Sequence, residues 1–370
     1  MAYEFETLKG DLYPAREQRL LTYSVSSEQK KVYEIFIREY KREVKSLQAQ
    51  GVLPVAYSAP LGIQLELTHK CNLNCIHCYN DSSGQTDTLS IEDWKRIAHE
   101  AVELGVYECV ITGGEPTIFP GLREVMDILY DGGVRMVMIT NGLTMTRALA
   151  KQMASYKLNW VQVSCDGLDA ETHDTIRKKK GSWKHVIMAA RYLVEEDIPV
   201  IVAHSVFRDQ IENVSDFVDM IGCLGCAETL IGEPLPVGRA AWDDEVSNSI
   251  VYSEEDQRLF IDVLQRKKAE WDGKMIVASP MPPYLAVKLE SIEPNQVLLL
   301  RPNGDVRLNC ITPFLVGNVK NKSLSQVWEQ CKLAYKNEKI HAYGDEICET
   351  RDLMKSKFGI THKGKQTNLY

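Results

Sequence analysis

The chain has 370 residues, of which 44% are hydrophobic and 25% are charged, a composition typical of a globular protein with one large domain and one smaller domain. Its net charge of −8 argues against nucleic acid as a substrate or partner, because phosphate recognition depends on an excess of Lys and Arg. No apolar run approaches the ~20 residues of a membrane span, and the N-terminus has no apolar signal core.

The first 60 residues are predicted to form an N-terminal helical extension, with one helix over residues 27–50. Apolar residues recur at spacings of three and four from Tyr33 to Leu47, which gives this helix an apolar stripe. We expect the stripe to pack on the domain that follows. A docking surface for a substrate peptide or a partner protein is the alternative.

Strand-like and helix-like segments alternate over residues 61–272. Six such units with short connections predict an α/β fold, in which a parallel sheet curls into a partial (β/α)6 TIM-like barrel. Chemistry in such a sheet collects at the C-terminal ends of the strands. The strands are expected at 63–67, 109–112, 134–139, 160–164, 199–206 and 228–231. The helices are expected at 90–104, 122–130, 146–156, 183–196 and 253–271, with one more that follows the fifth strand and ends near residue 220.

The pattern changes over residues 273–370, which are predicted to form a small α+β C-terminal domain. Residues 296–308 have the pattern of a hairpin with its turn at Asn303-Gly304. The segment VGNV follows at 316–319, and a helix is expected over 324–335.

A cysteine-rich loop, KCNLNCIHCYN at residues 70–80, follows the first predicted strand. Ten cysteines without a secretion signal indicate a reducing cytoplasm, where cysteines are ligands or free thiols rather than disulfides. Soft thiolates favour zinc or an iron–sulfur cluster, and three ligands leave one metal position open. A zinc site that also uses His69 or His77, or three ordinary thiols, are the alternatives. The loop contains Cys71, Cys75 and Cys78.

A second motif, TGGEP at residues 112–116, ends the next predicted strand. With this motif, the cysteine spacing and the aromatic Tyr79 after the third cysteine, the sequence resembles the radical SAM superfamily. The resemblance is good over residues 61–240 and weaker to about residue 330. It implies one [4Fe–4S] cluster on the three cysteines and S-adenosylmethionine (SAM) bound at its open iron.

The resemblance also implies which residues contact SAM. Gly113 and Gly114 leave the backbone free of side chains beside the cluster, as close approach of a ligand requires. This segment, with Glu115, is expected to bind the amino group of SAM. The complete set of expected contacts is Tyr79, Gly113, Gly114, Glu115, Pro116, Asn141, Ser164, Asp166, Arg177, Leu230 and Ile231.

Strand alternation and charge support part of this set. Ser164 and Asp166 lie two residues apart on a strand and therefore share a face, whereas Cys165 points toward the helices. By resemblance, Ser164 or Asp166 contacts the ribose or carboxylate of SAM. The alternative for Asp166 is that it shapes the turn before Gly167. Arg177 is expected to pair with the carboxylate, because its guanidinium suits that group. A solvated basic run over Arg177–Lys180 is the alternative.

The remaining cysteines and histidines have no matched partners in the sequence. Cys223 and Cys226 have a spacing that suits zinc or redox chemistry, but they precede the sixth strand on the lower face of the barrel. We expect two ordinary thiols there. Single core or surface histidines are expected at His173, His185 and His204.

The C-terminal region resembles an auxiliary-cluster domain of the SPASM type. It lacks the cysteine that full members carry before the hairpin, and only Cys331 and Cys348 follow Cys310. Three scattered cysteines fit a four-ligand cluster poorly. We therefore expect a degenerate SPASM-like domain with no second cluster. Cys310 is expected to be a leftover buried thiol, and a hydrogen-atom donor to the substrate is the alternative.

The branch that the sequence resembles is rich in maturases of ribosomally made peptides. It implies an enzyme that modifies a precursor peptide by crosslinking, epimerisation or backbone excision, with a flavodoxin- or ferredoxin-like electron donor. The N-terminal extension is too short and too helical for a fused leader-binding domain, so a separate leader-binding protein is expected. The alternatives are an oxidoreductase of a small molecule or cofactor precursor, and a non-catalytic iron–sulfur electron carrier or sensor.

Overall fold

The structure is a computed structural model of residues 1–370. It describes residues 27–80, 86–234, 238–241, 246, 249–250, 252–280, 289–290, 292, 296–310, 314–334, 337 and 367–368.

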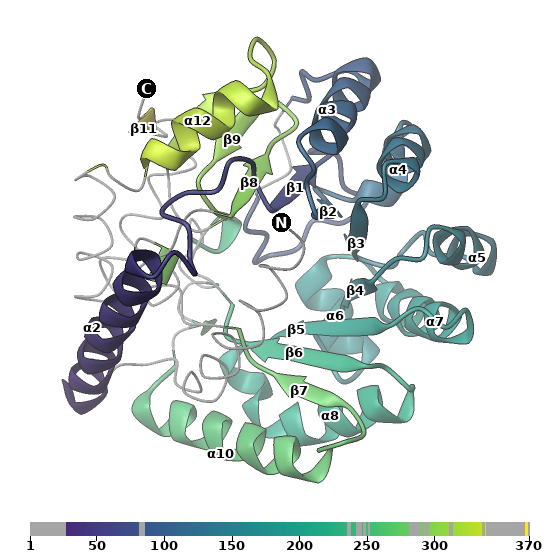
Figure 1. Ribbon diagram of the computed structural model, residues 1–370. Coiled ribbons are helices and arrows are strands. Elements are labelled where there is room, and N and C mark those ends of the chain that lie inside the picture. The colour runs from purple at the N-terminus through teal and green to yellow at the C-terminus, as the bar shows by residue number, and fades with distance from the viewer. Residues whose placement is uncertain are drawn as a thin grey trace.

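One sheet of eleven strands runs through the molecule in the order β11-β10-β9-β8-β1-β2-β3-β4-β5-β6-β7 (Figure 1). The strands from β1 to β7 are parallel, which confirms the predicted partial barrel. These strands are β1 (Gly62–Glu66), β2 (Glu108–Thr112), β3 (Arg135–Thr140), β4 (Trp160–Ser164), β5 (Val200–Ser205), β6 (Glu228–Gly232) and β7 (Ile276–Ala278).

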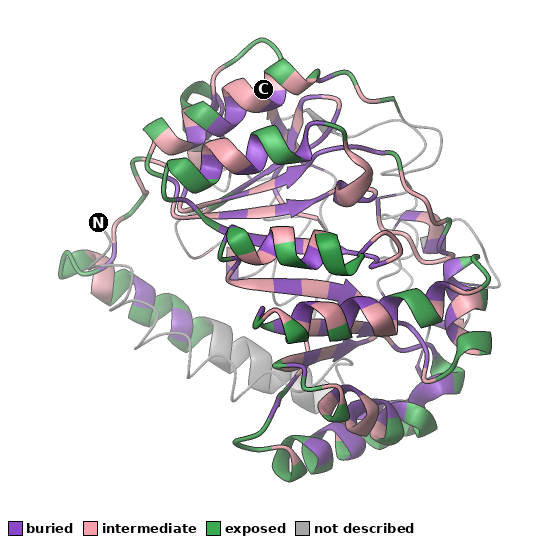
Figure 2. Ribbon diagram, turned by 90° about the vertical axis from the view of Figure 1, so that its right-hand side faces the viewer, coloured by how far each residue is buried: buried purple, intermediate pink, exposed green. Residues whose placement is uncertain are grey.

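Helices connect the parallel strands and cover one face of the sheet. Figure 2 shows their exposed residues turned outward and their buried residues turned toward the strands. The helices are α3 (Ile91–Glu103), α4 (Leu122–Asp131), α5 (Arg147–Ser155), α6 (Ala170–Arg177), α7 (Ser182–Glu195), α8 (Val214–Cys223) and α10 (Glu254–Glu270).

Local sequence explains where these helices start and which face they bury. Ser90 and Asp93 form a capping box at the start of α3, so two backbone N–H groups that the helix cannot satisfy gain acceptors. Trp94 and Ile97, three residues apart, are both fully buried against the sheet. A second capping box, formed by Ser253 and Asp256, starts α10 in the same way.

The strand register brings the C-terminal ends of the parallel strands together at one edge of the sheet. Glu66 at the end of β1 pairs with Thr112 at the end of β2, and Ser164 at the end of β4 pairs with Ala203 of β5. The loops that follow these strands therefore meet over the barrel mouth, where parallel α/β proteins place their sites.

The C-terminal segment extends the barrel sheet. The predicted hairpin forms from β8 (Val297–Leu300) and β9 (Asp305–Arg307), and β8 pairs in parallel with β1. The sheet thus runs without a break across residue 272, and β7 lies just beyond that position. Three more elements complete this part: β10 (Phe314–Asn318), α12 (Leu324–Ala334) and β11 (Thr367–Asn368).

Three features were not predicted from the sequence. β7 has only three residues and α6 has only eight, so each is too short for a periodic pattern to be distinguished from chance. The third feature, the pairing of β8 with β1, joins segments that are more than 230 residues apart in the chain. Such pairing depends on packing rather than on local sequence.

The N-terminal helix α2 (Ser27–Ala49) agrees with the expected helix at 27–50. Two residues of its predicted apolar stripe, Tyr40 and Val44, are buried. Within the described residues, no helix has the length and apolar character needed to cross a bilayer.

The continuous sheet predicts that the C-terminal hairpin and the barrel unfold together. Leu300 of β8 is fully buried and faces the same core as Leu65 of β1. Leu300→Ala should lower the free energy of unfolding by about 2–5 kcal/mol. Urea denaturation, followed both by far-UV circular dichroism and by tryptophan fluorescence, measures this change.

Val297 lies on the same strand but is 44% exposed, so Val297→Ala is the control. It should change the free energy of unfolding by roughly 0.5 kcal/mol or less. Separate transitions for the two probes in Leu300→Ala would contradict a single cooperative sheet.

Candidate active site

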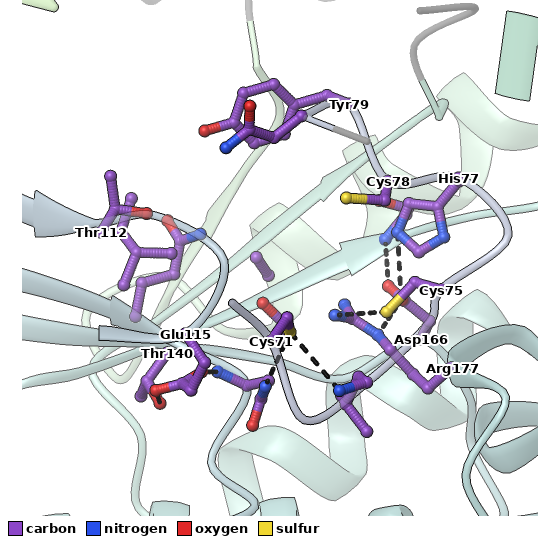
Figure 3. Close-up of a pocket in the computed structure, with 18 of the residues that line it drawn as sticks. Cys71, Cys75, His77, Cys78, Tyr79, Thr112, Glu115, Thr140, Asp166 and Arg177 are labelled. Atoms are coloured by element: carbon purple, nitrogen blue, oxygen red, sulfur yellow. Dashed lines mark hydrogen bonds and ion pairs between the residues drawn. The ribbon is translucent and has the colours of Figure 1, made fainter. Parts of the chain in front are cut away.

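A cavity of about 420 Å³ opens at the C-terminal ends of the barrel strands. The three cysteines of the loop after β1 line it together with residues from the ends of β2 to β6 (Figure 3). Residues that the sequence analysis identified in separate parts of the chain thus meet in this one cavity.

The cysteine loop supplies a donor set that fits an iron–sulfur cluster. Cys71, Cys75 and Cys78 all line this one cavity, which is the arrangement that three thiolate ligands of one cluster require. Burial raises the pKa of Cys71 to about 11 and also raises the pKa of Cys75, so a bound cluster must displace protons from these sulfurs. When bound, such a cluster supplies one-electron reduction and an open iron for a ligand.

The TGGEP segment packs directly against the cysteine loop. The Gly114 N–H donates to the Thr68 carbonyl at 2.6 Å, and the Glu115 N–H donates to the Lys70 carbonyl at 2.9 Å. A Cβ on Gly113 would lie 2.7 Å from the Thr68 oxygen, and one on Gly114 would clash with the Lys70 carbonyl. The glycines therefore let two backbones meet, in addition to lining the cavity. The groups of these two glycines that can accept hydrogen bonds from an ammonium group are their backbone carbonyl oxygens.

Glu115 ties the end of β2 to the end of β3. Its carboxylate is fully buried and accepts hydrogen bonds from Thr117 Oγ1 at 2.6 Å, Thr140 Oγ1 at 2.7 Å and the Asn141 N–H at 2.8 Å. Burial raises the pKa of Glu115, and these donors oppose the rise. The carboxylate is thus largely occupied by the protein itself.

Asn141 carries this connection to the cysteine loop. Its Nδ2 donates to Asn72 Oδ1 at 2.7 Å and lies 3.7 Å from Cys71 Sγ. The side chain therefore lies against Cys71, the first cysteine of the loop.

A buried ion pair anchors the other side of the loop. Asp166 Oδ2 lies 2.6 Å from Arg177 Nε, and Arg177 Nη1 lies 3.6 Å from Cys75 Sγ (Figure 3). Burial alone would raise the pKa of Asp166, but the charge of Arg177 and the other groups around it hold that pKa well below its usual range. Arg177 is buried, so it does not belong to a solvated basic run.

Three histidines that the sequence could not connect gather around Asp166. His77 Nε2 lies 3.3 Å from Asp166 Oδ2, and His173 Nδ1 accepts from the Asp166 N–H at 3.0 Å. His204 stacks on Phe217 with 4.1 Å between ring centroids, and its Nδ1 lies 4.0 Å from Asp166 Oδ1. Burial lowers the pKa of each histidine to about 4, so all three are neutral at pH 7.

Gly238 and Arg239 were missed as site residues. The Arg239 N–H donates to the Cys78 carbonyl at 2.9 Å, and Arg239 Nη1 donates to the Cys75 carbonyl at 2.6 Å. Gly238 has φ +61° and packs so closely that a Cβ would clash with the Cys78 and Tyr79 carbonyls. No local signal in PLPVGRA identifies this role, since it depends on the loop after β6 reaching back to the cysteine loop.

The remaining predicted residues fall into two groups, those that line the cavity and those that do not. Tyr79, Ser164, Leu230 and Cys310 line the cavity with the residues described above. Ile231 lies in the hydrophobic core, because successive residues of a strand point to opposite faces. Pro116 is buried at the start of a 3₁₀ turn and does not line the cavity either.

The other described cysteines and His69 do not line the cavity. Cys165, Cys226 and Cys331 belong to the core, Cys223 is exposed at the end of α8, and Cys348 lies outside the described residues. The ring of His69 contacts Asp87 through Nδ1 at 3.1 Å and Arg301 through Nε2 at 3.4 Å. Both ring nitrogens are therefore engaged within the protein.

The close packing of Gly238 against the cysteine loop predicts that a side chain at this position weakens cluster retention. Gly238→Ala should weaken retention of the reconstituted cluster about tenfold, because the added methyl group overpacks the loop by about 1–3 kcal/mol. Iron per chain after gel filtration, and the rate of iron loss to a chelator, measure the effect.

Gly273 is the matched control, since it has a similar φ of +71° but no atom within 4 Å of an added Cβ. Gly273→Ala carries the same backbone strain without the clash. Equal iron retention in the two variants would contradict the assigned role of Gly238.

Comparison with known proteins agrees with this geometry. Residues 65–221 match the sequence model of the Radical SAM superfamily. The chain is 28% identical over 282 residues to the antilisterial bacteriocin subtilosin biosynthesis protein AlbA of Bacillus subtilis (strain 168), across 74% of this chain and 60% of AlbA. It is 30% identical over 192 residues to the AdoMet-dependent heme synthase of Methanosarcina barkeri (strain Fusaro / DSM 804), across 51% of this chain and 55% of that protein. The chain thus spans 60% or less of the length of these two relatives.

The fold is similar to that of SuiB from Streptococcus suis, solved bound to the precursor peptide SuiA. The TM-score is 0.62 with 16% sequence identity, across 78% of this chain and 68% of SuiB. At this level of identity the similarity establishes the fold.

Proposed function

Because the chain belongs to the radical SAM superfamily, we propose that it uses one [4Fe–4S] cluster and SAM to form a 5′-deoxyadenosyl radical, which abstracts hydrogen from a ribosomally made precursor peptide. Crosslinking, epimerisation or backbone excision of the peptide would follow. The observation that carries this proposal is the single cavity shared by the three loop cysteines and the TGGEP segment.

The chain's residues have distinct proposed roles around the cofactors. The three cysteines hold the cluster and leave one iron open. The carbonyl oxygens of Gly113 and Gly114 accept from the amino group of SAM. Asp166 holds one edge of the Arg177 guanidinium, which leaves other N–H donors for the SAM carboxylate. Ser164 serves the ribose, and Leu230 supplies apolar surface to the adenine.

A peptide substrate is favoured by the relatives. AlbA is named for biosynthesis of a bacteriocin, and SuiB was solved with a precursor peptide. Similarity to the heme synthase supports a second candidate function, which is modification of a cofactor precursor. Comparing 5′-deoxyadenosine formation with a candidate precursor peptide and with a porphyrin separates the two.

Cys310 is the proposed hydrogen-atom donor if the reaction is an epimerisation. Its thiol lines the cavity, and burial raises its pKa to about 11, so it keeps its hydrogen at neutral pH. Transfer of that hydrogen atom breaks the S–H bond and forms a C–H bond at the peptide α-carbon. One electron from the donor protein and one proton from solvent return the sulfur to a thiol.

The other proposed partners follow from the same chemistry. A flavodoxin- or ferredoxin-like protein supplies electrons in the cytoplasm, and a separate leader-binding protein presents the peptide. We also propose that the C-terminal region carries no second cluster, since Cys331 is enclosed in the core and Cys310 lines the SAM cavity.

Anaerobic reconstitution with iron, sulfide and dithionite tests the central proposal. The wild-type chain should bind about four irons and convert SAM to 5′-deoxyadenosine. Cys71→Ala should abolish this conversion, whereas Cys223→Ala should leave it unchanged because Cys223 is an exposed thiol outside the cavity. Iron content and chromatography of the nucleoside are the measurements.

Zinc in place of iron, or a reducible cluster that never yields 5′-deoxyadenosine, would refute the enzyme assignment. The second outcome would indicate an electron carrier or sensor. About eight irons per chain would refute the absence of a second cluster.

The role of Cys310 predicts the source of hydrogen in the product. With the precursor peptide in D2O, the wild-type chain and Cys223→Ala should place one deuterium on the modified α-carbon. Cys310→Ala should still form 5′-deoxyadenosine but lose this deuterium incorporation, because the donor thiol is gone. Mass spectrometry of the peptide reports the label, and unchanged incorporation in Cys310→Ala would assign the donor elsewhere.

A further inference from the structure

The basic run Arg177–Lys180 at the end of α6 contains one buried residue and three exposed residues. Arg177 is buried against Cys75, while the lysines after it are exposed on the surface of a chain whose net charge is −8. None of these ammonium groups forms an ion pair with a described residue. We call this exposed set the lysine surface; it comprises Lys178, Lys179, Lys180 and Lys184.

The lysine surface adjoins the cysteine loop directly. The Ile76 N–H, one residue after the ligand Cys75, donates to the Ile176 carbonyl at 3.0 Å. From Lys178 the chain reaches Ile176 in two residues and crosses this hydrogen bond to the residue next to Cys75. A short covalent and hydrogen-bonded route therefore joins the lysine surface to a cluster ligand.

The turn that carries the lysines is held in place by Asp174. Its carboxylate accepts from Ser182 Oγ at 2.9 Å and from the Trp183 N–H at 2.8 Å, and it also accepts from the Gly181 N–H. The carboxylate closest to the lysines in the sequence is thus engaged in hydrogen bonds within the turn. The turn itself is fixed, with Lys178 in the left-handed region at φ +54° as the C-cap of α6.

We propose that the lysine surface is the docking site for an acidic one-electron carrier protein, which reduces the cluster held by the cysteine loop. This inference rests on the proposed function. Electron-transfer partners form small, transient contacts, and complementary charge steers their encounter. One electron leaves the carrier and enters the cluster, no bond forms or breaks, and the oxidised carrier dissociates.

Charge and position together favour this occupant. The overall charge of −8 repels a nucleic acid backbone, and a local positive surface on such a chain suits a partner that presents acidic side chains at close range. The surface also lies near the point where an electron has to arrive, because its chain segment is hydrogen-bonded to the residue next to Cys75.

The test compares two reductants on the reconstituted full-length chain. Photoreduced flavodoxin has to dock, whereas dithionite is a small molecule that does not. In the triple variant Lys178→Glu, Lys179→Glu and Lys180→Glu, the rate of cluster reduction by flavodoxin at low salt should fall roughly tenfold or more. The rate with dithionite, and 5′-deoxyadenosine formation with dithionite, should not change.

A matched control carries the same total charge change on other exposed lysines, Lys151→Glu, Lys268→Glu and Lys320→Glu. This variant should be reduced by flavodoxin at close to the wild-type rate. Equal flavodoxin rates for the two triple variants would overturn the proposal.

A measurement on the wild-type chain keeps the proposal testable if the triple variant folds poorly. The flavodoxin rate should fall steeply as salt is raised, while the dithionite rate stays constant. A flavodoxin rate that does not depend on salt would overturn the docking site. Binding of a DNA duplex that is lost in the variant, with flavodoxin reduction unaffected, would assign the surface to nucleic acid instead.

These outcomes are distinct from failure of the proposed function. If dithionite reduces the cluster of the wild-type chain but no 5′-deoxyadenosine forms, the enzyme assignment fails. A change in flavodoxin reduction in the lysine variant would still be measurable, since cluster reduction is followed by absorbance and electron paramagnetic resonance.

Discussion

The close approach of two backbones at the ends of β1 and β2 is the constraint on which the site depends. Gly113 and Gly114 let the TGGEP segment hydrogen-bond to the main chain of Thr68 and Lys70, directly before the first cysteine. A side chain at either glycine would push the cysteine loop away from the barrel mouth. Once the loop is seated, Glu115 extends the connection to β3 through Thr140 and Asn141. The position of the three loop cysteines is therefore set by parallel strand pairing.

Buried charge secures the opposite side of the loop. Asp166 and Arg177 are both enclosed, and their ion pair holds the guanidinium against Cys75. Removing one member of a buried pair costs about 3–5 kcal/mol because it leaves an unpaired charge. The Ser205 N–H and the neutral histidines around Asp166 fill the remaining positions of its carboxylate. Arg239 adds a second guanidinium from the loop after β6, which binds the backbone of the same loop.

The C-terminal region contributes to the site through the sheet. Pairing of β8 with β1 places the segment after β9 beside the cavity, which brings Cys310 to the cavity wall. The C-terminal segment thus helps to line the cavity that the barrel strands form. The turn after α6 exposes lysines to solvent. The cysteine loop thus lines the cavity and is also hydrogen-bonded, through Ile76 and Ile176, to the segment that leads to these lysines.

The sequence by itself determined the barrel class, the grouping of the three loop cysteines and much of the cavity lining, because these follow from short-range patterns. Alternation placed Ser164 and Asp166 on one face and Cys165 on the other, and three cysteines within eight residues had to lie together. Only the tertiary structure decided that His77 and His204 meet at Asp166. It also decided that Gly238 and Arg239 pack on and hydrogen-bond to the cysteine loop. The burial of Arg177 beside an exposed lysine is likewise visible only in the tertiary structure. It also joined β8 to β1. These contacts link residues far apart in the chain, and they exist because packing brings distant strand ends to one edge, which no local periodicity encodes.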